Sequence, residues 1–234
     1  MSPSDSNAMN APHTESRLVD RKFDFGDHLA DAARSLKRGE RTRAALRVAA
    51  CRLLDKSSPV DLTVAAICKK AQVAHGTFYI HFTDRHALLA DLARDFIDFV
   101  QDRLKQAAQD NAGDAIRGST AAYLDLFEQN PGLMRCLMSR LDSTPETREA
   151  FEVLNREWIT TVIEAEERRL ARAGREGAIS RDELKRRGYA LGGMIDQYLA
   201  SLFLARDPNV QRISTDRQAV INTLSLIWKR GMTP

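Results

Sequence analysis

Apolar residues recur at helical spacing along most of the chain, and this pattern predicts helices rather than strands. Between residues 39 and 54 the apolar positions lie on one face of a helix, at Leu46, Ala49, Ala50, Leu53 and Leu54. Two short helices are predicted next, over 64–70 and 74–81, and a long one follows over 85–108. The fold class expected from these periods is all-α.

Helix-start signals divide the second half of the chain. Pro131 suits the first position of a helix, and Ser180 with Glu183 forms a capping box. The helix opened by Thr144-Pro145 has a buried side predicted at Phe151, Leu154, Trp158, Val162 and Ala165. The helices predicted in this half cover 114–129, a stretch from Pro131, 146–173, 181–206 and a last segment from Ser214 or Asp216 to Gly231.

Positive charge is concentrated near the amino terminus. The whole chain of 234 residues carries a net charge of only +3. The segment 37–85 holds ten cations and four acids, so it carries +6 and the remainder carries −3. This asymmetry is expected when one part of a protein meets phosphates.

The same composition argues against several classes of protein. Cys51, Cys68 and Cys136 are odd in number and widely spaced, so neither a disulfide framework nor a metal site is expected from them. His75, His81 and His86 have spacings of six and five, which do not share one helical face, so no metal is predicted there either. No nucleophile–base pair, cofactor motif or membrane-spanning run is present, and we expect a cytoplasmic protein without cofactor or catalytic activity.

The two short helices and their turn, at 63–82, have the geometry that places a helix in the major groove of DNA. Thr63 is predicted to cap the first of them. A small core is expected from Val64, Ile67, Cys68, Val73, Phe78 and Phe82, packed on the Leu46 face. The side chains expected to point outward from the second helix are Ala74, His75, Thr77, Tyr79 and His81.

The stretch 62–82, LTVAAICKKAQVAHGTFYIHF, resembles the DNA-binding signature of the TetR family of transcriptional regulators. Its most specific part is the GTFYxHF run at 76–82, and the resemblance covers roughly residues 39–90. Gln72 replaces the usual turn glycine, so its side chain must accept a backbone that favours glycine. The organisation that the resemblance implies is a disordered arm over 1–36, a helix-turn-helix domain over 37–85 and a helical ligand-binding and dimerisation domain over 86–234.

Roles in DNA binding follow residue by residue from the resemblance. Thr63, Tyr79 and His81 are expected to contact phosphates, as are Arg41, Arg43 and Arg85. Ala74, His75 and Thr77 are candidates for base-edge contacts, and Gly76 lets the backbone approach the duplex. Because one short helix reads few bases, we expect a homodimer on a near-palindromic operator.

The resemblance also implies a small-molecule pocket and a dimer face in the second domain. The residues expected to line an apolar pocket are Phe99, Tyr123, Phe127, Met134, Leu137, Met138 and Trp158. The residues expected at the dimer face, from the last two helices, are Gly188, Gly192, Ile195, Leu199, Leu202, Val220, Leu224, Ile227 and Trp228.

The function predicted from these features is a sequence-specific repressor that a small apolar ligand releases from its operator. Two alternatives keep the same DNA-binding head: an activator, and a DNA-bound structural protein with no small-molecule inducer. A helical enzyme is the third alternative, and the lack of a catalytic constellation in the sequence argues against it.

Overall fold

The computed structural model describes residues 21–138 and 145–233, and every regular element in these ranges is a helix. The all-α prediction is therefore confirmed. The first four α-helices are α1 (Phe25–Ala32), α2 (Arg38–Leu54), α3 (Val64–Ala71) and α4 (His75–His81). The others are α5 (Arg85–Asp110), α6 (Ala115–Gln129), α7 (Pro131–Met138), α8 (Pro145–Arg172), α9 (Arg181–Leu199), α10 (Pro208–Ile213) and α11 (Arg217–Gly231).

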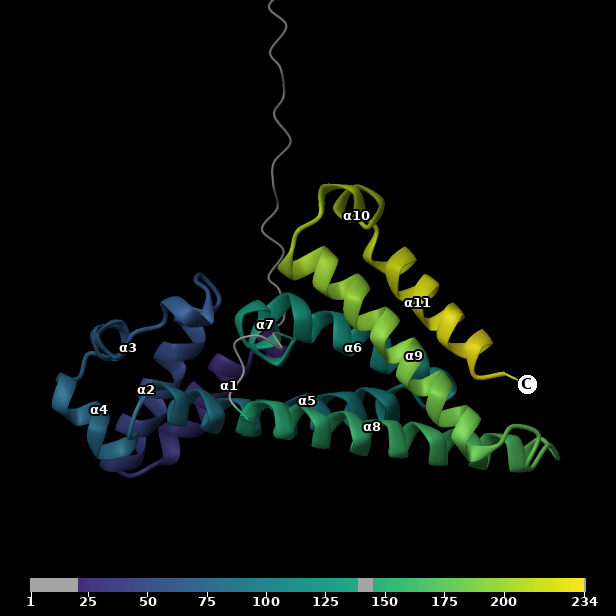
Figure 1. Cartoon of the computed structure of the whole chain (residues 1–234), viewed down its shortest axis with the longest axis horizontal. Helices are drawn as coiled ribbons and strands as arrows, with labels where there is room; N and C mark the ends of the chain where they lie inside the picture. Colours follow the sequence, from purple (N-terminus) through teal and green to yellow (C-terminus); the bar gives the residue numbers. More distant parts are fainter. Residues whose placement is uncertain (1–20, 139–144, 234) are drawn as a thin grey trace, which may run out of the picture.

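The helices form two groups that meet end to end, which we call the head (α1–α4) and the body (α5–α11) (Figure 1). In the head, α2 packs against both α1 and α3. In the body, the long α5 packs against α6 and α8, while α9 packs against α8 and α11. The head and body join where α2 packs on α7.

Several helix ends are fixed by the side chains that the sequence suggested. The Thr63 hydroxyl accepts a hydrogen bond from the Ala66 amide at 3.1 Å, and the Ser180 hydroxyl accepts one from the Glu183 amide at 3.2 Å. Gln72 ends α3 in the left-handed region, with φ of 57° and ψ of 43°. A non-glycine residue therefore does occupy the turn position that favours glycine.

The disordered arm predicted over 1–36 is wrong for its second half. Residues 1–20 lie outside the described residues, but Phe25 in α1 is only 1% exposed. Its ring lies 5.3 Å from the rings of both Phe96 and Phe99 on α5. An eight-residue helix has little stability of its own, so contacts made by the folded chain, rather than local periodicity, hold α1 in place.

The buried side predicted for the helix over 146–173 is correct only in part, because Trp158 and Val162 pack against the core but Ala165 does not. The buried side of α8 is formed by Ile159, Ile163, Glu166 and Leu170, whereas Ala165 is exposed and both Trp158 and Val162 are only partly buried. The side chains of Phe151 and Leu154 lie outside the described residues. The predicted residues and the observed buried residues both keep helical spacing, so periodicity alone cannot choose between two adjacent faces of the helix. The buried Glu166 carboxylate pairs with Arg169 at 2.5 Å, which offsets the cost of burying its charge.

Candidate nucleic-acid interface

The outward position of α4 depends on two buried aromatic side chains. Phe78 and Phe82 lie four residues apart, and their ring centroids are 5.8 Å from each other. Both are buried in the core of the head, together with Ile67 of α3 and Leu46 of α2. The predicted core of this unit is confirmed, and it leaves the opposite side of α4 facing solvent.

The solvent side of α4 carries most of the residues predicted to contact bases or phosphates. Ala74, His75 and Gly76 are exposed, and Tyr79 is 52% exposed with its ring centroid 5.4 Å from that of His75. A Cβ atom built at Gly76 would have no described neighbour within 4 Å, so the backbone there is open to a partner. The two remaining predicted residues of this helix, Thr77 and His81, are partly exposed.

Three exposed residues near this face were missing from the sequence-based assignment. Ile80 is 78% exposed, the highest value among the large apolar side chains of the described chain. It lies two positions from both Phe78 and Phe82, so helical geometry turns it away from the core, and that spacing was the available signal. Lys69 and Lys70 are exposed in the last turn of α3.

Some arginines of the basic segment already have partners inside the protein. Arg43 lies 2.6 Å from an Asp91 carboxylate oxygen, and its guanidinium carbon is 5.2 Å from the centroid of the Phe82 ring. Arg47 is buried and pairs with Asp91 and Asp95 of α5. The head thus uses part of its positive charge to dock on α5.

The predicted phosphate contacts outside α4 differ in their surroundings. The Arg85 Nη1 atom donates to the carbonyl oxygens of Val60 and Leu62, at 2.9 and 3.0 Å. Arg85 therefore holds the loop between α2 and α3 in this structure. Arg41 and Thr63 are exposed, and the Thr63 hydroxyl also caps α3.

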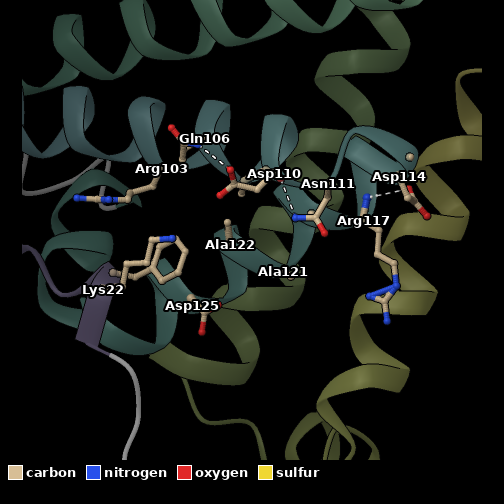
Figure 2. Close-up of a pocket in the computed structure, with 14 residues that line it drawn as sticks. Lys22, Arg103, Gln106, Asp110, Asn111, Asp114, Arg117, Ala121, Ala122 and Asp125 are labelled. Carbon is tan, nitrogen blue, oxygen red and sulfur yellow. Dashed lines mark hydrogen bonds between the residues drawn. The ribbon is translucent and has the colours of Figure 1, made fainter.

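The residues predicted to line a ligand pocket lie in or beside the core of the body. Phe99, Phe127, Met134 and Leu137 are buried, whereas Tyr123, Met138 and Trp158 are partly buried. The Tyr123 hydroxyl donates to Asp196 on α9 at 2.7 Å, and sequence reasoning did not single out that carboxylate. Burial raises the pKa of Asp196, and the hydrogen bond from Tyr123 opposes that shift. A pocket of about 510 Å³ exists elsewhere, and none of the seven residues lines it (Figure 2).

Most residues predicted for the dimer face pack inside their own chain. Ile195, Leu199, Val220, Leu224 and Trp228 are buried, and Gly188 is buried against Ile159 of α8. These positions are corrected, because apolar spacing marks the side of a helix that faces its own core. Gly192, Leu202 and Ile227 retain some exposure.

Other apolar or small residues of α9 and α11 reach the surface beside the retained positions. Tyr189 on α9 is 52% exposed, and Leu226 on α11 is 47% exposed. A Cβ atom built at Gly192 or Gly193 would have no described neighbour within 4 Å. This adjacent surface is therefore open to a partner.

The described residues offer little for other chemistry. They contain no group of three or more His, Cys, Asp or Glu side chains placed to hold a metal ion. Burial raises the pKa of the Cys51 thiol to about 12, so this sulfur stays protonated and packs as a small apolar group. Within the described ranges, no helix has the length and apolar character needed to cross a bilayer.

Comparison with known proteins points to the same part of the chain. Residues 46–92, from α2 into α5, match the family model described as "Bacterial regulatory proteins, tetR family". The chain is 26% identical over 195 residues to the HTH-type transcriptional regulator EthR of Mycolicibacterium smegmatis, covering 81% of this chain and 85% of that protein.

Two solved structures share the fold at low sequence identity. A transcriptional regulator FadR from Bacillus subtilis, in complex with stearoyl-CoA, superposes with a TM-score of 0.63 at 15% identity, covering 80% of this chain and 97% of the other. NalD, the secondary repressor of the MexAB-OprM multidrug efflux pump in Pseudomonas aeruginosa, superposes with a TM-score of 0.54 at 24% identity. The match covers 82% of this chain and 95% of the other.

Proposed function

We propose, for this member of the TetR family of transcriptional regulators, that it binds an operator as a homodimer and represses transcription until a small molecule releases it. The observation that carries the proposal is the two-sided character of α4. Phe78 fixes one side in the core of the head, and the other side presents His75 and Tyr79 to solvent. A rigid short helix with an exposed polar face suits the major groove.

The exposed residues of the head supply both kinds of DNA contact. Ala74, His75, Thr77 and Ile80 face the base edges, where the apolar groups among them suit thymine methyls. Tyr79, His81 and Thr63 bind the flanking phosphates together with Arg41. Lys69 and Lys70 add positive charge at the end of α3.

Dimerisation uses the outer surface of α9 and α11 rather than their buried sides. Tyr189, Gly192, Gly193, Leu226 and Ile227 form the surface that we assign to the dimer. Two heads are then presented to successive major grooves, whose centres are about 34 Å apart.

The switch requires a ligand site in the body and a change in the spacing of the heads. The relative FadR of Bacillus subtilis is bound to stearoyl-CoA, which supports a ligand with a long apolar part. Here the Tyr123–Asp196 pair lies beside Phe127, whose ring is 5.2 Å from that of Tyr123. A ligand that separates these helices would shift α5 and α7, on which the head is docked.

The test is selection of bound sequences from a pool of random duplexes, followed by affinity measurements on the selected DNA. We expect a near-palindromic site and weaker binding by about 1–3 kcal/mol in His75→Ala or Tyr79→Ala. Thermal unfolding of each variant checks that the head stays folded. Unchanged DNA affinity in both variants would refute the assignment of the exposed side of α4 as the DNA-binding face. If the selection enriches no sequence, sequence-specific binding is refuted.

A further inference from the structure

A pocket of about 510 Å³ lies where η1 (Arg21–Phe23), just before α1, meets the carboxyl-terminal half of α5 and the start of α6 (Figure 2). We call it the η1 pocket. Its volume falls within the range of small-molecule sites, which is roughly 300–1,000 Å³. The residues on which the argument rests are Lys22, Phe23, Arg103, Ala121 and Ala122.

Equal numbers of cations and acids line the η1 pocket, but two of the three acids already pair with cations from outside it. Of the three lining acids, Asp114 pairs with Lys229 at 2.6 Å and Asp125 pairs with Arg217 at 2.5 Å. Both of these cations come from α11 and do not line the pocket. The third acid, Asp110, accepts a hydrogen bond from the neutral Gln106 side chain. Arg217 also pairs with Glu128 at 2.7 Å, so the lining residues and their ion-pair partners amount to five cations and four acids.

Arg103 is the cation best placed to receive a ligand. Its guanidinium carbon lies 4.8 Å from the centroid of the Phe99 ring, which fixes its position. Its Nε atom is shielded from water and has no hydrogen-bond partner among the described residues. Lys22 lies at the same end of the pocket as Arg103 (Figure 2). This end suits a carboxylate or another small anionic group.

The rest of the pocket lining combines polar residues with an apolar part. The Phe23 ring and the small side chains of Ala121 and Ala122 form the apolar part. Small alanine side chains leave room for a compact ring or short chain. An anionic group at one end and an apolar body at the other describe the ligand that this surface fits.

The η1 pocket is connected through α1 to α2, the helix on which α3 packs. The Phe99 ring under Arg103 also contacts Phe25 and His28, at centroid distances of 5.3 and 4.9 Å. The residue before Phe25 is Asp24, whose carboxylate lies 2.8 Å from Arg52 on α2 of the head. The segment that forms one wall of the pocket is therefore also joined to α2 by an ion pair.

We propose that the η1 pocket binds a small organic anion with a compact apolar body and that α1 transmits its occupancy to the head. This site is separate from the apolar core where the inducer is expected. The effect on DNA rests on the proposed function, whereas binding of the anion does not. The two parts of the proposal are therefore measured separately.

Calorimetric titration of the full-length protein tests the site itself. Benzoate and hexanoate serve as probes, with neutral benzamide and inorganic phosphate as comparisons. We expect one carboxylate bound per chain, weaker binding of benzamide and phosphate, and a loss of about fivefold or more in Arg103→Gln. Lys105→Gln removes the same charge from an exposed position on α5 outside the pocket and is expected to bind as the wild type does.

Three results would refute binding of a carboxylate in the η1 pocket. Failure of both carboxylates to bind, equal affinity in Arg103→Gln, or phosphate binding as tight as that of benzoate would refute the site. If Arg103→Gln unfolds, the exposed Lys22→Gln variant decides the same question.

To test transmission, DNA affinity is measured with and without saturating carboxylate, in the wild type and in Arg52→Gln. We expect a change in the wild type that is reduced in Arg52→Gln, and no change in the wild type would refute transmission. Absence of DNA binding without any carboxylate would instead refute the proposed function.

Discussion

Phe78 and Tyr79 are neighbours in sequence but differ in their surroundings on α4: the Phe78 side chain is fully buried, and Tyr79 is 52% exposed. Their rings meet edge to face, with centroids 5.4 Å apart. The buried ring holds the helix on the core, so the exposed ring has a defined position.

Replacing Ile80 by alanine is expected to weaken DNA binding by about 1–2 kcal/mol, because the exposed side chain would be buried against the duplex. Ile213, which is 70% exposed at the end of α10, provides the matched control. Fluorescence anisotropy on a selected duplex measures both variants. An equal effect of Ile80→Ala and Ile213→Ala would contradict the placement of α4.

The junction of head and body predicts a strong effect at Gly132. A Cβ atom there would lie 2.3 Å from the carbonyl carbon of Leu54, so an alanine must push α7 away from α2. We expect Gly132→Ala to lower the free energy of unfolding by about 1–3 kcal/mol. Gly39→Ala, in open space near the start of α2, is expected to be neutral or to stabilise by up to about 1 kcal/mol. Denaturant unfolding distinguishes them, and equal free energies of unfolding would contradict the close contact.

The Tyr123–Asp196 pair predicts a pH dependence of stability. Burial raises the pKa of Asp196 above its ordinary value of 3.8, so ionisation of this carboxyl disfavours the folded state. Below pH 3.8 the group is protonated in both states and contributes nothing. As the pH rises through the raised pKa, the wild type should lose stability relative to Asp196→Asn, which keeps an acceptor for Tyr123. Unfolding curves measured from pH 3 to pH 8 give the comparison, and a constant difference between the two proteins would refute the assignment.

The surface that we assign to the dimer predicts the behaviour of a charged substitution. Leu226→Glu places a charge on an exposed apolar position of α11, and we expect it to shift the protein from dimer to monomer and to weaken operator binding. Ile213→Glu introduces the same charge on α10 and should leave the dimer intact. Sedimentation velocity reports the mass of each variant. A dimeric Leu226→Glu protein would place the interface elsewhere.

The helix-turn-helix unit was largely predictable because its signals are local. Thr63 caps α3, Gln72 turns the chain, and the four-residue spacing of Phe78 and Phe82 defines the buried side. The same spacing indicates that Ile80 is exposed, but an apolar side chain was not among the residues expected to contact DNA. What the sequence could not show is that Arg43 and Arg85 already bind groups of their own chain, since those partners are distant in sequence.

The body was less predictable because its helices offer several apolar faces. Ile195 and Leu199 have helical spacing, as a dimer face would, yet they pack on their own chain. Helix α1 and the Asp196 contact depend on residues about 70 or more positions away, and no local pattern encodes such pairings.

The most direct test of the central claim places a cleavage reagent on α4. An iron chelate that generates hydroxyl radicals is attached to Ile80→Cys, in a protein whose partly exposed Cys136 is replaced by serine. With a selected duplex, we predict strand cleavage in two clusters about one helical turn apart, centred on the half-sites. The same reagent at Ile213→Cys should give none. Bound DNA that Ile80→Cys leaves uncut at the half-sites would contradict the assignment of α4 as the recognition helix.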